Sequence, residues 1–264
     1  MNPIDVKKEV EKKNKSLLRI PFLISWLKKI VHEKEINDFL SIYGELQGAS
    51  FAREVLKFFN VYAHVITKVS LPKDGRYIFV ANHPLGGLDG IALITTITDM
   101  FHDVKFPVND ILLSIKNFDS IFIPINKHGA QSRDAVKKTN EAYASNLPIA
   151  MFPAGLVSRK IDGKIVDLQW QKHFVKKAIE SKRTIVPVYI EAKNSNRFYR
   201  IANWRKWLGI KSNIEMLFLS DEIFRQKNKT FKIVFGTPIP YEQLQNGSLQ
   251  DQADCIRKKV YALA

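Results

Sequence analysis

At residues 77–94 the chain reads YIFVANHPLGGLDGIALI. Its first five residues are apolar, residues 82–90 form a glycine-rich turn, and an apolar pattern resumes at Ile91. This order predicts a strand, a turn and a helix in succession. The turn carries an imidazole and a carboxylate, from His83 and Asp89.

A histidine beside a carboxylate is typical of a general base. The unperturbed imidazole pKa of ~6.5 lies near working pH, and the carboxylate fixes the tautomer. Gly86, Gly87 and Gly90 suit a tight turn that approaches a ligand closely. A second interpretation stays open, in which Asp89 is only the N-cap of a helix that begins near Gly90 and His83 is an ordinary loop residue.

Three later blocks also end short apolar runs with a turn. They read IFIPINKHG at 121–129, LPIAMFPAG at 147–155, and TIVPVYI at 184–190. Ligands of α/β sheets bind outside the carboxyl ends of the strands, where these turns are expected to lie. The blocks therefore predict one shared site.

In this order the four blocks resemble the glycerolipid acyltransferase superfamily, typified by 1-acylglycerol-3-phosphate acyltransferase. The resemblance covers residues 76–190. Members carry an Asn-His motif with a downstream Asp, a strand followed by a basic residue, a Phe-Pro-Glu-Gly block and a Val-Pro-Val block. Within the superfamily, the segments NHPLGGLDG, PINKHG and FPAG with VSR are more similar to one branch. That branch contains hemolysin-like proteins and the O-acyltransferases that make ornithine or glycine lipids.

The chain departs from the superfamily pattern in several places. Five residues separate His83 from Asp89, where four are common, so the glycine turn must absorb one more. Ala154 replaces the usual Glu of the third block, and Leu156 stands where the branch tends to carry Glu. The usual phosphate-binding Arg of the second block is missing, with Asn126 and Lys127 near its place. The changes in the second and third blocks point away from glycerol phosphate as the acceptor.

The resemblance implies a mechanism without a covalent acyl-enzyme. His83 would deprotonate the acceptor hydroxyl, Asp89 would orient His83, and the oxygen would attack an acyl thioester of acyl carrier protein or coenzyme A. No other cofactor and no metal is expected. The substrate-binding residues that it implies are Asn82, Gly86, Gly87, Asn126, Lys127, Phe152, Pro153, Gly155 and Arg159.

Two details of that binding site stay open. Backbone amides of the Gly86-Gly87 turn or of the Ala154-Gly155 turn are candidate donors to the oxyanion. The side chains of Lys127 and Arg159 are candidate partners of a carboxylate or phosphate. For each of these two cations, a solvated surface charge is the alternative.

Composition indicates a globular protein with an acidic partner. The chain has 264 residues, 45% of them hydrophobic, and a formal net charge of +15. Such a charge attracts nucleic acid, an anionic membrane surface or an acidic protein such as acyl carrier protein. No zinc-finger spacing, RNA-recognition signature or helix-turn-helix core supports nucleic acid. The single cysteine, Cys255, leaves no cysteine cluster for a metal.

The pattern of elements predicts an α/β fold with a mainly parallel central sheet flanked by helices. Residues 1–70 read as a helical N-terminal region, with helices at 36–43 and 51–62, and residues 71–264 as the acyltransferase domain. The later segments that we expect are helices at 133–145, 168–181 and 249–263 and strands at 214–219 and 230–235.

Two stretches combine aromatic, apolar and basic residues, at 16–31 and 197–208. This composition is typical of interfacial helices on an anionic membrane, although amphipathic helices packed on the core show the same pattern. No uninterrupted apolar window of ~18 residues is present, and the N-terminus does not resemble a secretory signal. We therefore expect a cytoplasmic protein peripheral to the inner membrane.

Two functions follow from these observations. The first is an O-acyltransferase that acts on a lyso amino-acid lipid (ornithine or glycine lipid) or a lysophospholipid. The second is a catalytically inactive relative that binds lipid or acyl carrier at the membrane surface, suggested by Ala154, Leu156 and the spacing of His83 and Asp89.

Overall fold

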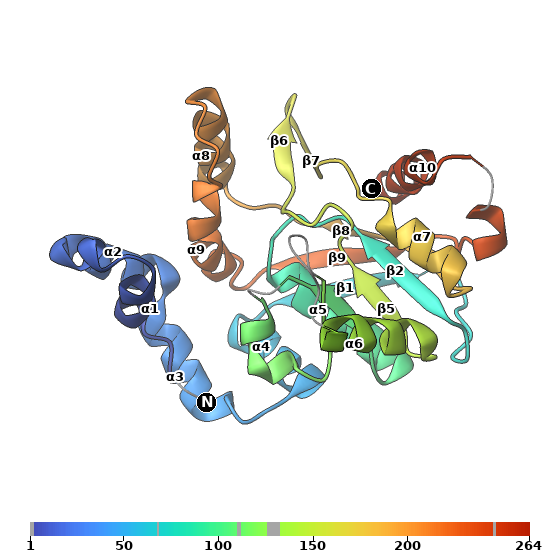
Figure 1. Cartoon of the computed structure of the whole chain (residues 1–264), viewed down its shortest axis with the longest axis horizontal. Coiled ribbons are helices and arrows are strands. Elements are labelled where there is room, and N and C mark those ends of the chain that lie inside the picture. Colours follow the sequence, from blue (N-terminus) through green and yellow to red (C-terminus); the bar gives the residue numbers. More distant parts are fainter. Residues whose placement is uncertain (1–2, 68, 110–111, 126–132, 245–246) are drawn as a thin grey trace. The chain divides into compact units, whose positions relative to one another are not determined.

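The computed structural model describes residues 3–67, 69–109, 112–125, 133–244 and 247–264 (Figure 1). The chain divides into two compact units. Unit 1 comprises Met1–Leu46 and Asn194–Lys227, and unit 2 comprises Gln47–Lys193 and Asn228–Ala264. Residue 70, the domain boundary that the sequence suggests, falls within unit 2.

Unit 2 contains a five-stranded sheet of order β1-β9-β8-β2-β5. The strands are β1 (Tyr62–Thr67), β2 (Tyr77–Ala81), β5 (Ile149–Met151), β8 (Thr184–Glu191) and β9 (Thr230–Phe235). Neighbouring strands are parallel except for the antiparallel pair β8 and β9. β2 lies inside the sheet and is buried throughout, as expected of a central strand in a parallel sheet. β5 ends the sheet, and its three residues are also buried. The predicted α/β fold with a mainly parallel sheet is confirmed.

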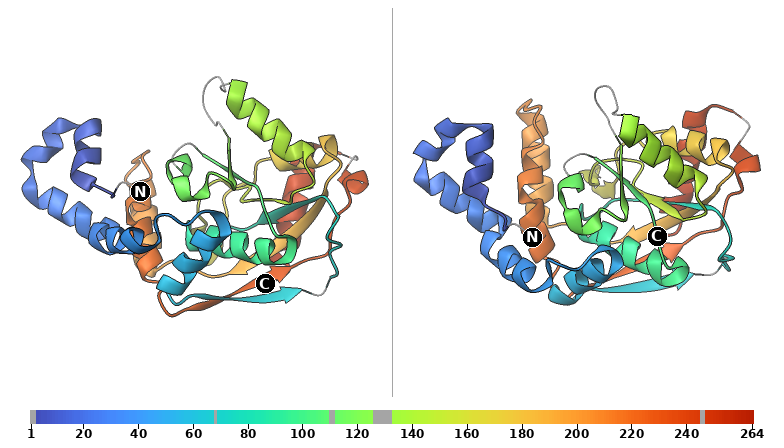
Figure 2. Two further views of the ribbon diagram at one scale, coloured as in Figure 1. Left: turned by 90° about the horizontal axis from the view of Figure 1, so that it is seen from below. Right: turned by 60° about the horizontal axis from the view of Figure 1, so that its bottom comes forward.

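Helices cover both faces of this sheet. Side chains of β2 alternate between the faces. Ile78 and Val80 belong to a core that includes residues of α7 (His173–Glu180) and α10 (Leu249–Tyr261). Phe79 packs on the opposite face, against Phe101 at the end of α5 (Leu88–Phe101), and α4 (Gly48–Phe58) packs beside α5 (Figure 2). The carboxyl end of β2 is therefore held between two packed layers.

The remaining elements of unit 2 are one helix, two short strand pairs and three 3-10 turns. They are the parallel pair β3 (Phe106–Val108) and β4 (Phe122–Pro124), the antiparallel pair β6 (Arg159–Ile161) and β7 (Lys164–Val166), helix α6 (Arg133–Ala144), and 3-10 turns η2 (Leu112–Ser114), η3 (Lys116–Phe118) and η5 (Tyr241–Leu244).

Unit 1 is helical in its described residues. Its elements are α1 (Val6–Lys13), η1 (Lys15–Arg19), α2 (Pro21–Val31), α3 (Glu33–Tyr43), α8 (Asn196–Trp207), η4 (Ile214–Phe218) and α9 (Leu219–Phe224). His32 joins α2 to α3 with a left-handed φ of 58°. Its Nε2 lies 3.1 Å from Asp221 Oδ1, and its ring stacks on Phe224 at 3.8 Å. His32 thus ties the N-terminal helices to the later segment of unit 1.

Three expectations about local structure were wrong. The helix expected at 168–181 begins only at His173, where α7 starts. The strand expected at 214–219 is η4 followed by α9, because Glu215, Met216 and Leu217 favour helix and Glu215 forms a buried ion pair with Arg205. The helical reading of 51–62 fails at its end, because α4 stops at Phe58 and Tyr62 begins strand β1. Among the described residues, no helix is long and apolar enough to span a membrane.

Candidate active site

His83 and Asp89 meet at the carboxyl end of β2. β2 ends at Ala81, and Asp89 lies in the first turn of α5. His83 Nδ1 is 2.9 Å from Asp89 Oδ2, with the two side chains 15% and 0% exposed. The pair is therefore shielded from water, while part of the imidazole remains accessible.

The glycine turn absorbs the additional residue between His83 and Asp89. Gly86 takes a left-handed φ of 89°, a conformation that glycine adopts without steric cost. The backbone N–H groups of Leu85 and Gly86 then both donate to Asp89 Oδ2, at 2.8 and 3.2 Å. Since α5 begins at Leu88 with Gly87 as its N-cap, the interpretation of Asp89 as the N-cap is wrong.

These contacts keep Asp89 ionised. Burial alone would raise the pKa of the Asp89 carboxyl, but the charge and hydrogen bond of His83 and the two turn amides more than offset it, so the pKa lies below its ordinary value. The carboxylate then accepts a hydrogen bond from the N–H of His83 Nδ1. The lone pair of the neutral ring is left on Nε2, which has no hydrogen bond to a described residue.

Phe152 fixes the plane of the imidazole. Its ring stacks on His83 with centroids 3.9 Å apart and planes 13° from parallel. Phe152 follows β5, the neighbour of β2, and Gly155 turns the chain with a φ of 63°. Pro153 is buried, and its carbonyl accepts the N–H of Gln171. The turn after β5 is thus joined to the turn after β2, as predicted.

The candidate oxyanion donors differ in availability. The Gly86 N–H donates to Asp89, and the Gly155 N–H donates to the Phe152 carbonyl at 3.0 Å. The N–H groups of Gly87 and Ala154 form no hydrogen bond with a described residue. These two amides remain the candidates for binding an oxyanion.

Asn82 and Arg159 lie beside the site but face the protein. The Asn82 side chain donates to the Ile190 carbonyl at 3.0 Å and accepts the Ile190 N–H at 2.7 Å, which joins the ends of β2 and β8. Arg159 is only 8% exposed and donates to the Val157 carbonyl, so it is not a solvated surface charge. Asn126 and Lys127 lie outside the described residues.

Asp167 is a residue of the site that the sequence reasoning missed. Its Oδ1 accepts the backbone N–H of His83 at 3.2 Å and the Ser158 hydroxyl at 2.6 Å, and its Oδ2 accepts the Trp170 indole N–H at 2.8 Å. It is 1% exposed. A carboxylate between Val166 and Leu168, three residues before a tryptophan, was the available signal.

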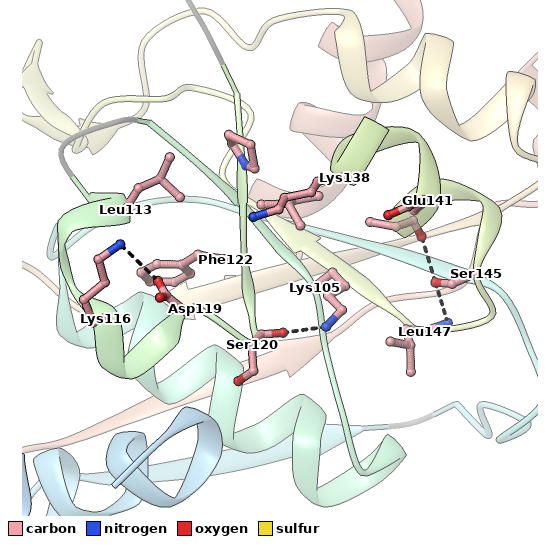
Figure 3. A pocket seen from close by; sticks show the side chains of 13 residues that line it. Lys105, Leu113, Lys116, Asp119, Ser120, Phe122, Lys138, Glu141, Ser145 and Leu147 are labelled. Atoms are coloured by element: carbon pink, nitrogen blue, oxygen red, sulfur yellow. Dashed lines mark hydrogen bonds and ion pairs between the residues drawn. The ribbon is translucent and has the colours of Figure 1, made fainter. Parts of the chain in front are cut away.

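A pocket of about 480 Å³ lies in unit 2 (Figure 3). A row of aromatic rings connects it to His83. The row runs from His83 through Phe152 and Phe106 to Phe122, with ring centroids 3.9, 5.4 and 6.5 Å apart. Phe122 lines the pocket, together with Lys105, Leu113, Lys116, Asp119, Ser120, Ile123, Pro124, Lys138, Glu141, Ala142, Ser145 and Leu147. His83 and Asp89 do not line it, so the reaction centre and the pocket are separate features.

The imidazole of His83 can act as a base toward a hydroxyl, and the Gly87 and Ala154 amides lie in the turns that follow β2 and β5. Within the described residues, no group of three or more His, Cys, Asp or Glu side chains is placed to hold a metal ion. The imidazole Nε2 of His83 is the candidate group for proton transfer at this site.

Comparisons with known proteins identify the family of the chain. A family model described as Acyltransferase matches residues 9–264. The lyso-glycine lipid O-acyltransferase of Bacteroides thetaiotaomicron is 42% identical over 92% of this chain and 90% of its own length. That of Phocaeicola vulgatus is 41% identical over 98% of this chain and 95% of its own. The crystal structure of the 1-acyl-sn-glycerophosphate acyltransferase PlsC from Thermotoga maritima aligns with 96% of this chain and 97% of its own, at 16% identity and a TM-score of 0.44, too low to bear on this site.

The chain therefore belongs to this acyltransferase family, and it is an enzyme. The resemblance to the glycerolipid acyltransferase superfamily is confirmed. The close contact between His83 and Asp89 also removes the spacing argument for an inactive relative.

Proposed function

From membership of this acyltransferase family, we propose that the chain transfers a fatty acyl group from an acyl thioester to the hydroxyl of a lyso amino-acid lipid, with lyso-glycine lipid as the first candidate. The name shared by both curated relatives, each more than 40% identical over nine-tenths or more of its length, carries the choice of acceptor. The 2.9 Å contact of His83 Nδ1 with Asp89 carries the mechanism.

The reaction begins at the free imidazole nitrogen. His83 Nε2 takes the proton of the acceptor hydroxyl as the oxygen attacks the thioester carbonyl, and the C–O bond forms. Asp89, held as a carboxylate, stabilises the imidazolium. The tetrahedral intermediate then breaks its C–S bond, and the thiolate takes the proton from Nε2, which restores the neutral imidazole.

Two amides support the charge that develops on the carbonyl oxygen. The N–H groups of Gly87 and Ala154 follow the two strands that carry His83 and Phe152. A donor already aimed at an oxyanion is worth about 2.7–4 kcal/mol in enzymes where one has been removed. With the base and its positioning, these donors account for the catalysis that we propose.

Acyl carrier protein is the donor that we propose first, with acyl coenzyme A as the alternative. The net charge of +15 attracts an acidic protein over a distance and favours productive encounters at low salt. Both donors present the same thioester to His83.

An acyl-transfer assay tests the proposal. The donors are acyl carrier protein and coenzyme A that carry a labelled acyl group, and the acceptors are lyso-glycine lipid, lyso-ornithine lipid and 1-acylglycerol-3-phosphate. We expect product with lyso-glycine lipid and a loss of kcat of roughly 10²–10⁴ in His83→Ala, because the general base is gone. His64→Ala, on the exposed face of β1, is the matched control. Undiminished turnover by His83→Ala would refute the mechanism, and a preference for 1-acylglycerol-3-phosphate would refute the acceptor.

A further inference from the structure

Helix α8 and the segment after it expose large apolar side chains. Trp204 is 66% exposed, Trp207 83% and Leu208 61%. The same helix buries Phe198, Tyr199 and Ala202 on its other side. Since the core-facing side of α8 is already occupied, the reading of residues 197–208 as merely a helix packed on the core does not account for the two tryptophans.

The charge around these side chains has one sign. Residues 192–214 contain six Lys or Arg and no Asp or Glu. Two of the cations, Arg197 and Arg205, form ion pairs with Asp221 and Glu215 inside unit 1. The other exposed cations of α8 and of the turn after it are Arg200, Lys206 and Lys211. Within the described part of the chain, no carboxylate forms an ion pair with any of these three.

Helix α2 adds apolar side chains of the same kind. Phe22 is 76% and Trp26 43% exposed, and their spacing of four residues places them on one face of the helix. The edge of the Trp26 ring packs on Phe218 of η4 at 6.0 Å. Arg197 of α8 lies over the same Phe218 ring at 5.1 Å. Two stretches that are far apart in sequence therefore meet within unit 1 around one phenylalanine.

We propose that these residues form a surface that docks on an anionic lipid bilayer. The aromatic surface comprises Phe22, Trp26, Trp204, Trp207, Leu208 and Leu217, with Arg200, Lys206 and Lys211 as its cations. Tryptophan suits the membrane interface because its ring is apolar while its N–H stays in the polar region. The unpaired cations match the charge of anionic headgroups. The inference deepens the proposed function, because a lyso-lipid acceptor resides in such a bilayer.

Exposed apolar side chains argue against nucleic acid as the occupant. Leu208 and Leu217 are 61% and 54% exposed and offer nothing to a phosphate backbone, whereas insertion among acyl chains removes them from water. A second copy of this chain is the competing occupant, and the experiment must separate it from lipid.

Sedimentation of the full chain with vesicles of phosphatidylglycerol and phosphatidylcholine tests the surface. Trp204→Ser/Trp207→Ser should lower the vesicle partition coefficient by about tenfold or more, because binding scales with the buried apolar area. Ile42→Ser/Tyr62→Ser is the matched control, since these side chains are 72% and 64% exposed but lie outside the aromatic surface. It should bind vesicles like the wild type.

A charge variant gives an independent measurement. Arg200→Gln/Lys206→Gln/Lys211→Gln should weaken binding to phosphatidylglycerol vesicles and flatten its dependence on salt. Vesicle binding by the tryptophan variant that equals wild type would overturn the proposal. So would a variant that loses a dimer in analytical ultracentrifugation while its vesicle binding stays unchanged, because the occupant would then be a second copy.

Activity on acceptor dispersed in detergent micelles separates this proposal from the proposed function. The tryptophan variant should retain wild-type turnover there, since none of its changes touches the site around His83. If the wild type shows no transfer in micelles while vesicle binding still depends on Trp204 and Trp207, the proposed reaction fails and the lipid surface stands.

Discussion

Unit 2 buries an ionised side chain near each end of β2, and the two are satisfied differently. At the carboxyl end, Asp89 holds an imidazole whose second nitrogen has no hydrogen bond to a described residue. At the amino end, Arg183 is fully buried just before β8 and donates only to backbone carbonyls. Its acceptors are the carbonyls of Tyr77, Ala142, Tyr143, Ser145 and Leu147.

The difference separates a structural charge from one that we propose to support catalysis. Arg183 binds carbonyls at the end of α6, where a helix leaves acceptors without partners and its dipole favours a cation. Burial and the nearby Arg76 lower the pKa of Arg183 to about 10, so it still carries its charge at neutral pH. The hydrogen bonds that its guanidinium donates to described residues all stabilise the fold. Asp89 instead keeps its charge and hydrogen-bonds an imidazole whose second nitrogen has no hydrogen bond to a described residue.

Removal of Arg183 should have the largest effect on folding. Arg183→Met leaves several buried carbonyls without a donor, and we expect the free energy of unfolding to fall by about 3–5 kcal/mol. Urea denaturation measures the change. Arg183→Lys should lose less, because an ammonium keeps the charge but lacks the planar fork of donors. If the folded fraction of Arg183→Met also loses kcat, the division between structural and catalytic ends fails.

Asp89→Asn should impair acyl transfer at the carboxyl end of β2. The amide retains the size of the side chain but not the charge that sets the tautomer of His83, and we expect kcat to fall by roughly 100-fold or more. Initial rates of acyl transfer measure this loss. The matched control is Asp99→Asn on the same helix, whose side chain is 63% exposed and pairs with Arg53 at the surface. Equal rates in the two variants would remove Asp89 from the mechanism.

Asp167→Asn should lower kcat less than Asp89→Asn does. The amide oxygen can still accept the His83 N–H, but the amide NH₂ then faces the Trp170 indole N–H, and two donors cannot pair. The backbone under His83 shifts, and we expect kcat to fall about tenfold with little change in KM, since misplacement acts on the transition state. Ser158→Ala, which removes one donor to Asp167 and leaves the His83 contact, should lose less. A loss confined to the amount of folded protein would make Asp167 purely structural.

The smallest effect that we expect is a pH-dependent difference in stability between the wild type and Asp89→Asn. The pKa of Asp89 is lower in the folded protein than in the unfolded chain, so its contribution to stability is present above the unfolded value near 3.9 and is lost as the pH falls through the folded value. The stability gap between wild type and Asp89→Asn should therefore be constant above about pH 5 and narrow below pH 4. Thermal unfolding at a series of pH values measures the gap. A gap that widens in acid would reverse the sign of the pKa shift.

Strands β2 and β8 could be predicted from sequence because burial on both faces leaves a continuous apolar run, whereas β9 shows an alternation of exposed and buried residues. β2 and β9 have the expected bounds, and β8 extends the expected run by one residue. β1 could not be read in this way. It lies at the edge of the sheet, none of its residues is fully buried, and it follows a helix without a strong break. Its pairing with β9 is a long-range contact that local pattern does not contain.

The parts of the site that could be predicted are those whose residues lie in the sequence motifs. His83, Asp89 and Phe152 come together as the motifs suggest, because parallel neighbours end at the same edge of the sheet. Asn82 was expected to bind substrate, yet both ends of its amide bond the backbone of Ile190. Asp167 escaped because its partners lie at sequence distances where no local pattern connects them.

The pairing of β1 with β9 also governs how the chain can fold. Asn60 beside β1 hydrogen-bonds Asn228 beside β9, a separation of 168 residues. The sheet therefore cannot acquire its β1 edge on the ribosome until the residues of β9 have emerged, and such non-local pairing folds slowly. Assembly of unit 1 is delayed in the same way, because the contact of His32 with Asp221 cannot form until Asp221 has been synthesised. During synthesis the N-terminal helices are thus exposed long before their partners exist, which makes this enzyme a candidate client of chaperones.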